Sequence, residues 1–120
     1  MVLMLVSLAG CQRATSHSLA GEWVMMDGVL QFPRVCGAHG PITYSADGQY
    51  SLWGEAGTWR LDDGKLTETM TGVEPMHVDR SPEEIGKPDV STIRWLDRDR
   101  FTKRFADGSV FEFRRCPARG

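Results

Sequence analysis

The sequence predicts an all-β protein, an antiparallel up-and-down meander that closes into a small barrel of about eight strands. Asp-Gly dipeptides supply the positive φ angles of tight hairpin turns, and they recur at residues 27–28, 47–48, 63–64 and 107–108. The short runs between these turns alternate apolar and polar residues and are rich in β-branched and aromatic side chains. Because no long crossover separates the hairpins, closure is the arrangement that leaves no exposed sheet edge.

The predicted strands are short and follow one another through turns. In one of them Ile42 and Tyr44 share a face, and in another Phe111 and Phe113 share a face with Glu112 on the other. This period of two indicates one buried and one wet face. The strands are expected at Gly21–Met26, Val29–Val35, Pro41–Ser45, Gln49–Trp53, Gly57–Leu61, Lys65–Thr71, Ser91–Leu96, Arg100–Ala106 and Ser109–Arg115.

Residues 72–89 form the long connection in this pattern. Ser81 followed by Pro82 is a helix-start signature, but Gly86 and Pro88 stop the helix after about one turn. We therefore expect a loop with one helical turn. Loops of this length are uncommon and are often functional or mobile.

Composition limits the class of protein. A chain of 120 residues is expected to form a single domain, and 41% hydrophobic with 25% charged residues is ordinary for a folded protein. The net charge of −2 argues against a dedicated nucleic-acid binder. No apolar run reaches the roughly 18 residues that a membrane-spanning helix needs.

The N-terminus has the composition of a secretory signal. Residues 1–10 carry no charge and end in small residues, and the chain turns polar directly after Cys11. Leu8-Ala9-Gly10-Cys11 resembles the bacterial lipobox, in which a peptidase cuts before a lipid-modified cysteine. A buried N-terminal strand is the alternative, but the Ser/Thr-rich stretch that follows fits it less well. No Lys or Arg precedes the apolar run, so we expect an upstream start or a truncated sequence.

The lipobox resemblance implies an order of segments. Residues 1–10 would be the signal peptide, residues 11–20 the lipidated cysteine and a tether, residues 21–116 the barrel, and residues 117–120 a C-terminal tail. Gln12 follows the lipidated cysteine, and in Gram-negative lipoproteins a residue other than Asp there implies the outer membrane, facing the periplasm. The expected membrane contact is therefore the lipid anchor on Cys11.

The two remaining cysteines form an even pair. Cys36 and Cys116 are expected to be disulfide-bonded in an oxidising compartment, although two buried free thiols are the alternative. His39 lies near Cys36, but no C-x-x-C or H-x-x-H spacing is present. We therefore predict no metal site and no cofactor.

Two further resemblances bear on fold and location. Gly21-Glu22-Trp23 resembles the G-x-W near the first strand of lipocalin-like proteins, and this implies a Trp that plugs the closed end of the barrel. The stretch Ile42–Thr71 and the ending F-R-R-C-P resemble small uncharacterised lipoproteins of proteobacteria. Both resemblances imply a lipocalin-like envelope lipoprotein, and neither implies an activity.

Aromatic residues are the first candidate ligand-binding set. A barrel of about eight strands is either filled by its side chains or holds one small ligand. The four Trp residues fit both arrangements, because large aromatic side chains build cores and also line cavities for apolar ligands. The candidate ligand-binding residues are Trp23, Tyr44, Trp53, Trp59 and Trp95.

Catalytic signals are weak. Glu55 lies in a glycine-flanked stretch that is typical of a hairpin turn, and His17 is expected to be solvated in the tether. His39 and His77 lie in loops, and no serine or cysteine nucleophile motif accompanies them. We therefore expect no catalytic residue and no enzymatic activity.

Basic residues gather near the C-terminus. Residues 94–119 hold eight basic and four acidic residues. Arg94, Arg104 and Arg114, with His77 of the long loop, form a candidate partner-binding set that would meet lipid phosphates or an acidic partner. The alternative is a solvated sheet face with cross-strand ion pairs.

These features together predict a monomeric, non-enzymatic, acyl-anchored envelope lipoprotein that acts as a binding module. Its expected partners are a small apolar ligand or an envelope protein, and no nucleic acid. An alternative is a periplasmic inhibitor of a hydrolase such as lysozyme, which would present residues 72–89 to the enzyme.

Overall fold

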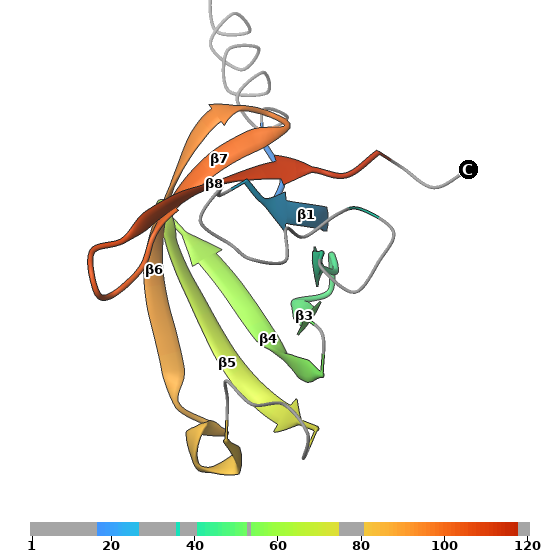
Figure 1. Cartoon of the computed structure of the whole chain (residues 1–120), viewed down its shortest axis with the longest axis vertical. Helices are drawn as coiled ribbons and strands as arrows, with labels where there is room; N and C mark the ends of the chain where they lie inside the picture. The colour runs from blue at the N-terminus through green and yellow to red at the C-terminus, as the bar shows by residue number, and fades with distance from the viewer. Residues whose placement is uncertain (1–16, 27–35, 37–40, 53, 75–80, 118–120) are drawn as a thin grey trace, which may run out of the picture.

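A computed structural model of the chain describes residues 17–26, 36, 41–52, 54–74 and 81–117. Eight antiparallel strands form a closed barrel in sequence order, and β1 pairs with both β2 and β8 (Figure 1). The strands are β1 (Gly21–Met25), β2 (Ile42–Tyr44), β3 (Gln49–Leu52), β4 (Glu55–Asp62), β5 (Lys65–Val73), β6 (Pro88–Asp97), β7 (Arg100–Arg104) and β8 (Val110–Arg115). The predicted all-β meander barrel is confirmed.

Turn chemistry explains the connections. Asp63 and Gly64 have φ angles of 52° and 81°, the pair of positive values that a type I′ hairpin requires. The dipeptides at 47–48 and 107–108 also lie in turns between strands, whereas residues 27–28 and the predicted strand Val29–Val35 lie outside the described residues. The predicted helical turn is the 3₁₀ helix η1 (Pro82–Glu84), and the Ser81 backbone N–H donates to the Glu84 carboxylate over 3.0 Å.

The alternating strand directions give the barrel two ends. The closed end holds residues 17–20 and the hairpin turns at 45–48, 62–65 and 97–100. The open end holds the connections from β3 to β4, from β5 to β6 and from β7 to β8, and η1 belongs to the second of these (Figure 1). Among the residues that the structure describes, no helix is long and apolar enough to cross a bilayer.

Trp23 fills the closed end. Its side chain is fully buried, its ring packs edge-on against Phe101 at 4.7 Å between centroids, and its indole N–H donates to the Leu19 carbonyl over 2.9 Å. The Arg115 guanidinium lies over the same ring, 4.3 Å from its centroid. Trp23 thus occupies the place that the lipocalin resemblance implied.

Residues 18–20 are part of the barrel end rather than of a free tether. Leu19 is only 2% exposed and belongs to the core. Arg115 donates to the carbonyl oxygens of Ser18 and Ala20 over 2.8 and 2.9 Å. His17 is exposed, but its ring stacks on Trp95 at 4.9 Å. Burial of the apolar Leu19 side chain packs this segment against the closed end. The predicted tether, residues 11–20, is shorter by these residues.

The disulfide between Cys36 and Cys116 is confirmed, with Cα atoms 5.6 Å apart. Cys116 directly follows β8, and its backbone N–H donates to the Glu22 carbonyl over 2.7 Å. The bridge therefore ties the connection between β1 and β2 to the end of the last strand.

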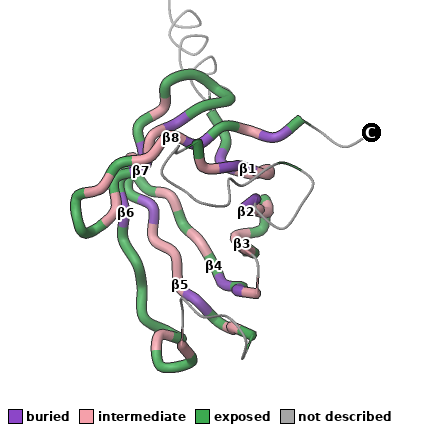
Figure 2. Tube along the Cα trace, in the orientation of Figure 1, coloured by how far each residue is buried: buried purple, intermediate pink, exposed green. Residues whose placement is uncertain are grey.

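Buried and exposed positions alternate along the strands, as β4 illustrates (Figure 2). Glu55 and Gly57 are buried, while Ala56 and Thr58 are exposed. A Cβ at Gly57 would collide with the Thr69 carbonyl oxygen and the Tyr50 ring, so only glycine fits there.

Candidate functional site: a carboxylate-lined cavity at the open end

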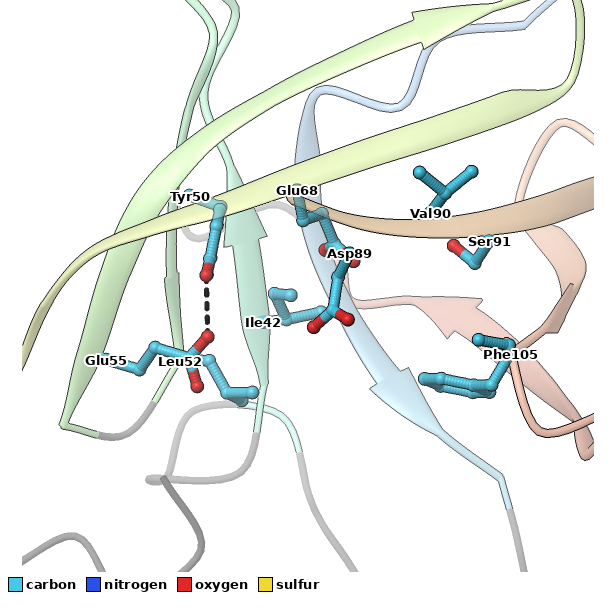
Figure 3. A pocket seen from close by; sticks show the side chains of 10 residues that line it. Ile42, Tyr50, Leu52, Glu55, Glu68, Asp89, Val90, Ser91 and Phe105 are labelled. Atoms are coloured by element: carbon cyan, nitrogen blue, oxygen red, sulfur yellow. Dashed lines mark hydrogen bonds between the residues drawn. The ribbon is translucent and has the colours of Figure 1, made fainter. Parts of the chain in front are cut away.

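A cavity of about 130 Å³ lies inside the open end of the barrel (Figure 3). A cavity of roughly 150 Å³ is large enough for benzene, so this one suits a group of about that size. Its wall combines apolar and acidic side chains from β2, β3, β4, β5 and β6 and from the turn after β7. The lining residues are Ile42, Tyr50, Leu52, Glu55, Glu68, Asp89, Val90, Ser91, Phe105 and Ala106.

Glu55 forms one side of the cavity. It is 7% exposed, and the Tyr50 hydroxyl donates to its Oε2 over 2.6 Å (Figure 3). The prediction that Glu55 lies in a hairpin turn is wrong, because Glu55 is the first residue of β4 and pairs with Leu52 and Val73. Its place in the alternation points the side chain inward, with Gly57.

Glu68 and Asp89 form the middle of the wall. They are direct partners across β5 and β6, and both line the cavity. Their carboxylates therefore lie side by side between Glu55 and Ser91 (Figure 3). Two like charges at directly opposed positions of a sheet repel each other, so this arrangement depends on compensating partners.

A buried network holds Glu68 from behind. The Lys103 ammonium donates to Glu68 Oε1 over 2.8 Å, and the Tyr44 hydroxyl donates to Oε2 over 2.6 Å. The Lys103 and Glu68 side chains are only 5% and 12% exposed. The Lys103 ammonium also lies 4.8 Å from the centroid of the Phe105 ring, a cation–π distance.

Ser91 is the unusual member of the wall. It is 7% exposed, and within the described part of the chain its hydroxyl has no hydrogen-bond partner. A buried hydroxyl without a partner carries a desolvation cost of about 1–3 kcal/mol, and such groups are rare in native proteins. The Ser91 hydroxyl therefore marks a place where a partner from outside the chain would fit.

Tyr44 is a permanent proton donor in this network. Burial, followed by the negative charge of Glu68, raises the pKa of the Tyr44 phenol well above its usual value of 10.0. The phenol therefore keeps its proton, and its bond to Glu68, in ordinary alkaline buffers.

The raised pKa makes stability fall at high pH. The unfolded chain releases the Tyr44 proton near pH 10, before the folded chain does, so the stability that Tyr44 contributes is complete below pH 10 and is lost as pH rises through the folded-state pKa. We expect Tyr44→Phe to be less stable than the parent protein at pH 9, with a difference that shrinks above pH 10. Urea unfolding of both proteins at pH 9, 10 and 11 measures this difference in unfolding free energy. The other titrating groups are common to both proteins, so a change in the difference with pH reports on Tyr44. A difference that stays constant would contradict it.

The described members of the predicted aromatic set lie toward the closed end. Trp23 and Trp95 lie there, and the Trp59 indole N–H donates to the carbonyl of Ser45, in the turn at that end, over 3.0 Å. Tyr44 is 1% exposed and contacts two residues that line the cavity, Glu68 and Tyr50. Trp53 lies outside the described residues. None of the other four lines the cavity.

The predicted basic set lies on the outside of the barrel. Arg94, Arg104 and Arg114 are exposed on β6, β7 and β8. The Arg114 Nε atom lies 3.0 Å from the Glu112 carboxylate, and Arg100 donates to Asp97 over 2.9 Å and lowers the pKa of that carboxyl group. Ion pairs within the sheet therefore accompany part of this surface.

Several candidates lie outside the described residues: Cys11, His39 and His77. Among the residues that are described, no three or more His, Cys, Asp or Glu side chains gather as metal ligands would.

The sequence analysis missed Glu68, Lys103, Asp89 and Ser91. A signal for the first two was present, because Leu66 and Met70 flank Glu68 at a period of two and share its inward face. Phe101 and Phe105 flank Lys103 in the same way. Strand phase, rather than residue type, would have identified these inward charges.

No known family model matches the chain, and no curated protein is significantly similar to it. The strand order and the closure of the sheet therefore define the class of the protein, which is an eight-stranded meander barrel of the lipocalin-like shape.

Proposed function

We propose that this protein is a non-enzymatic, lipid-anchored binding module of the cell envelope that takes up a small ligand at the open end of its barrel. The observation that carries the proposal is the cavity with the unpartnered Ser91 hydroxyl in its wall. A protein that needed only a packed core would fill this space or place an apolar side chain there, since an empty polar site costs stability.

The size of the cavity limits the ligand. Aromatic side chains fill the closed end, and the cavity beside the mouth measures about 130 Å³. A molecule of roughly the volume of benzene fits inside. A larger molecule would place only its head there, and its remainder would extend through the mouth.

The anchor would orient the mouth away from the membrane. Lipidation at Cys11 is suggested by the lipobox resemblance, and six residues at most separate it from the segment that begins at Ser18. Six extended residues span about 20 Å. The closed end would then face the outer membrane, and the open end would face the periplasm.

Extraction of bound molecules tests this function. The full chain is purified from native envelopes in mild detergent, denatured, and analysed by mass spectrometry for released small molecules. We expect a molecule that is enriched with the parent protein and absent from Ser91→Leu, whose larger side chain fills the cavity. Thr92→Leu is the matched control, because Thr92 is the next residue along β6 and lies exposed on the outer face.

Only folded variants can be compared, and a cooperative thermal unfolding transition shows that a variant is folded. If Ser91→Leu does not fold, Ser91→Val replaces it, because valine also fills the cavity and is smaller. Identical small-molecule extracts from the parent and from a folded filling variant would overturn the proposal. The alternative, a hydrolase inhibitor that uses residues 72–89, would instead predict loss of inhibition on changes in that loop and none on filling the cavity.

A further inference from the structure

We propose that the cavity selects a small organic ammonium ion, a protonated primary amine that carries an apolar body of about five carbon atoms. This inference rests on the proposed function and specifies its ligand. It is argued from the charge of the wall, from the unpartnered hydroxyl and from the apolar side chains that share the space.

The wall is acidic on one side. Glu55, Glu68 and Asp89 all contribute carboxylates, and none of the described lining residues is basic. Carboxylates accept hydrogen bonds and donate none, so the wall favours a ligand rich in donors. An ammonium group supplies three N–H donors and a positive charge. Lys103 already pairs with Glu68, so a ligand ammonium would add positive charge on the cavity side of the directly opposed carboxylates of Glu68 and Asp89.

Ser91 supplies the independent observation. Ser91 and Phe105 lie at the same end of the cavity, and the Ser91 hydroxyl lacks a partner within the described residues (Figure 3). A serine oxygen has two lone pairs and accepts a hydrogen bond from an N–H donor. A ligand ammonium between Asp89 and Ser91 would give that hydroxyl a partner and would lie beside the Asp89 carboxylate.

The apolar part of the wall determines the rest of the ligand. Ile42, Leu52 and Phe105 line the cavity together with the carboxylates. A bare metal ion would leave these side chains without contact, and the described residues hold no metal-ligand cluster. A polyamine would place a second charge against the apolar side chains. An amine with a short hydrocarbon body satisfies both kinds of surface.

The barrel already binds one ammonium in this way. Lys103 places its ammonium against Glu68 at 2.8 Å and 4.8 Å from the centroid of Phe105. A carboxylate and an aromatic ring thus accommodate a buried ammonium a short distance behind the cavity wall. Asp89 and Phe105 offer the same two groups to a ligand on the cavity side.

Three five-carbon probes test the inference on the full chain in detergent micelles: pentylamine, pentan-1-ol and pentanoate. Binding is followed by NMR through the backbone amides of Glu55, Ser91 and Phe105, with titrations of empty micelles subtracted. A charged hydrogen bond contributes about 1.5–3 kcal/mol, so we expect pentylamine to bind at least about tenfold more tightly than pentan-1-ol. Pentanoate is expected to bind more weakly than either.

Substitutions in the cavity wall test which carboxylates produce the preference for pentylamine over pentan-1-ol. Asp89→Asn and Glu55→Gln should each weaken pentylamine binding by roughly tenfold and leave pentan-1-ol binding unchanged, since each keeps an acceptor oxygen and loses a charge. Glu83→Gln is the matched control, because Glu83 is an exposed carboxylate of η1 at the same end and does not line the cavity. It should leave both affinities unchanged.

The outcomes separate the two proposals. If pentan-1-ol binds as tightly as pentylamine, the cavity is a ligand site and the ammonium inference is overturned. Equal weakening by Glu83→Gln and Asp89→Asn would also overturn it, because the preference would then reflect overall charge. If none of the probes shifts the cavity amides, and extracts of the parent and of Ser91→Leu are identical, the proposed function itself fails.

Discussion

Replacement of Lys103 by methionine is expected to destabilise the barrel by about 3–5 kcal/mol. The change removes the ammonium that bonds Glu68 over 2.8 Å and leaves a carboxylate whose side chain is only 12% exposed. Breaking a buried pair from one side is costly because the remaining charge has lost its partner and is not solvated. Urea unfolding at pH 7 measures the loss.

A second replacement shows whether the stranded charge is the cause. In Glu68→Gln with Lys103→Met the charge is gone, while an amide oxygen remains to accept the Tyr44 hydroxyl. We expect the double variant to be more stable than Lys103→Met, which a double-mutant cycle expresses as a coupling between the two sites. Lys65→Met is the control, because Lys65 is exposed on β5 and should change stability by no more than about 0.5 kcal/mol. A loss below about 1 kcal/mol for Lys103→Met would contradict the argument.

Loss of the disulfide is expected to cost up to about 4.5 kcal/mol. Cys36 and Cys116 are 80 residues apart, so the bridge removes much of the conformational freedom of the unfolded chain. The value is an upper bound, because residual structure in the unfolded state reduces it. The measurement is urea unfolding of a variant with both cysteines changed to serine.

Cys11→Ser is the matched control for this experiment. It removes the third cysteine of the chain and leaves the bridge intact, so the barrel should unfold at the same urea concentration as the parent. Reduction of the parent protein with dithiothreitol should reproduce the loss seen in the double serine variant. Unfolding of that variant within about 1 kcal/mol of the parent would contradict the role assigned to the bridge.

The barrel could be predicted from the sequence because the turn dipeptides and the alternation of apolar and polar residues both indicate a series of hairpins, and closure leaves such a series without an exposed edge. Asp63-Gly64 has the backbone that its dipeptide demands, Trp23 lies where the G-x-W resemblance implied, and Cys36 and Cys116 pair as the even count of remaining cysteines predicted. These features depend on neighbours in sequence or on simple counting. They can therefore be predicted without knowing which strands pair with one another.

The cavity depends on information that a single strand does not carry. The opposition of Glu68 and Asp89 follows from the register between β5 and β6, and a slip of one residue would turn one of them outward. The empty space beside Ser91 follows from the summed volume of side chains on several strands. Leu19 was assigned to a tether because one apolar residue in a polar stretch has no periodic pattern to reveal its burial.

The return of β8 to the closed end has a practical consequence for engineering. Arg115 bonds the carbonyl groups of Ser18 and Ala20, so the first and last described stretches of the chain leave the barrel on the same side. A fluorescent protein or affinity handle fused at the C-terminus would therefore leave the mouth unobstructed. A circular permutant that joins these termini and opens at Asp107-Gly108 would move the fusion points to the rim of the mouth instead.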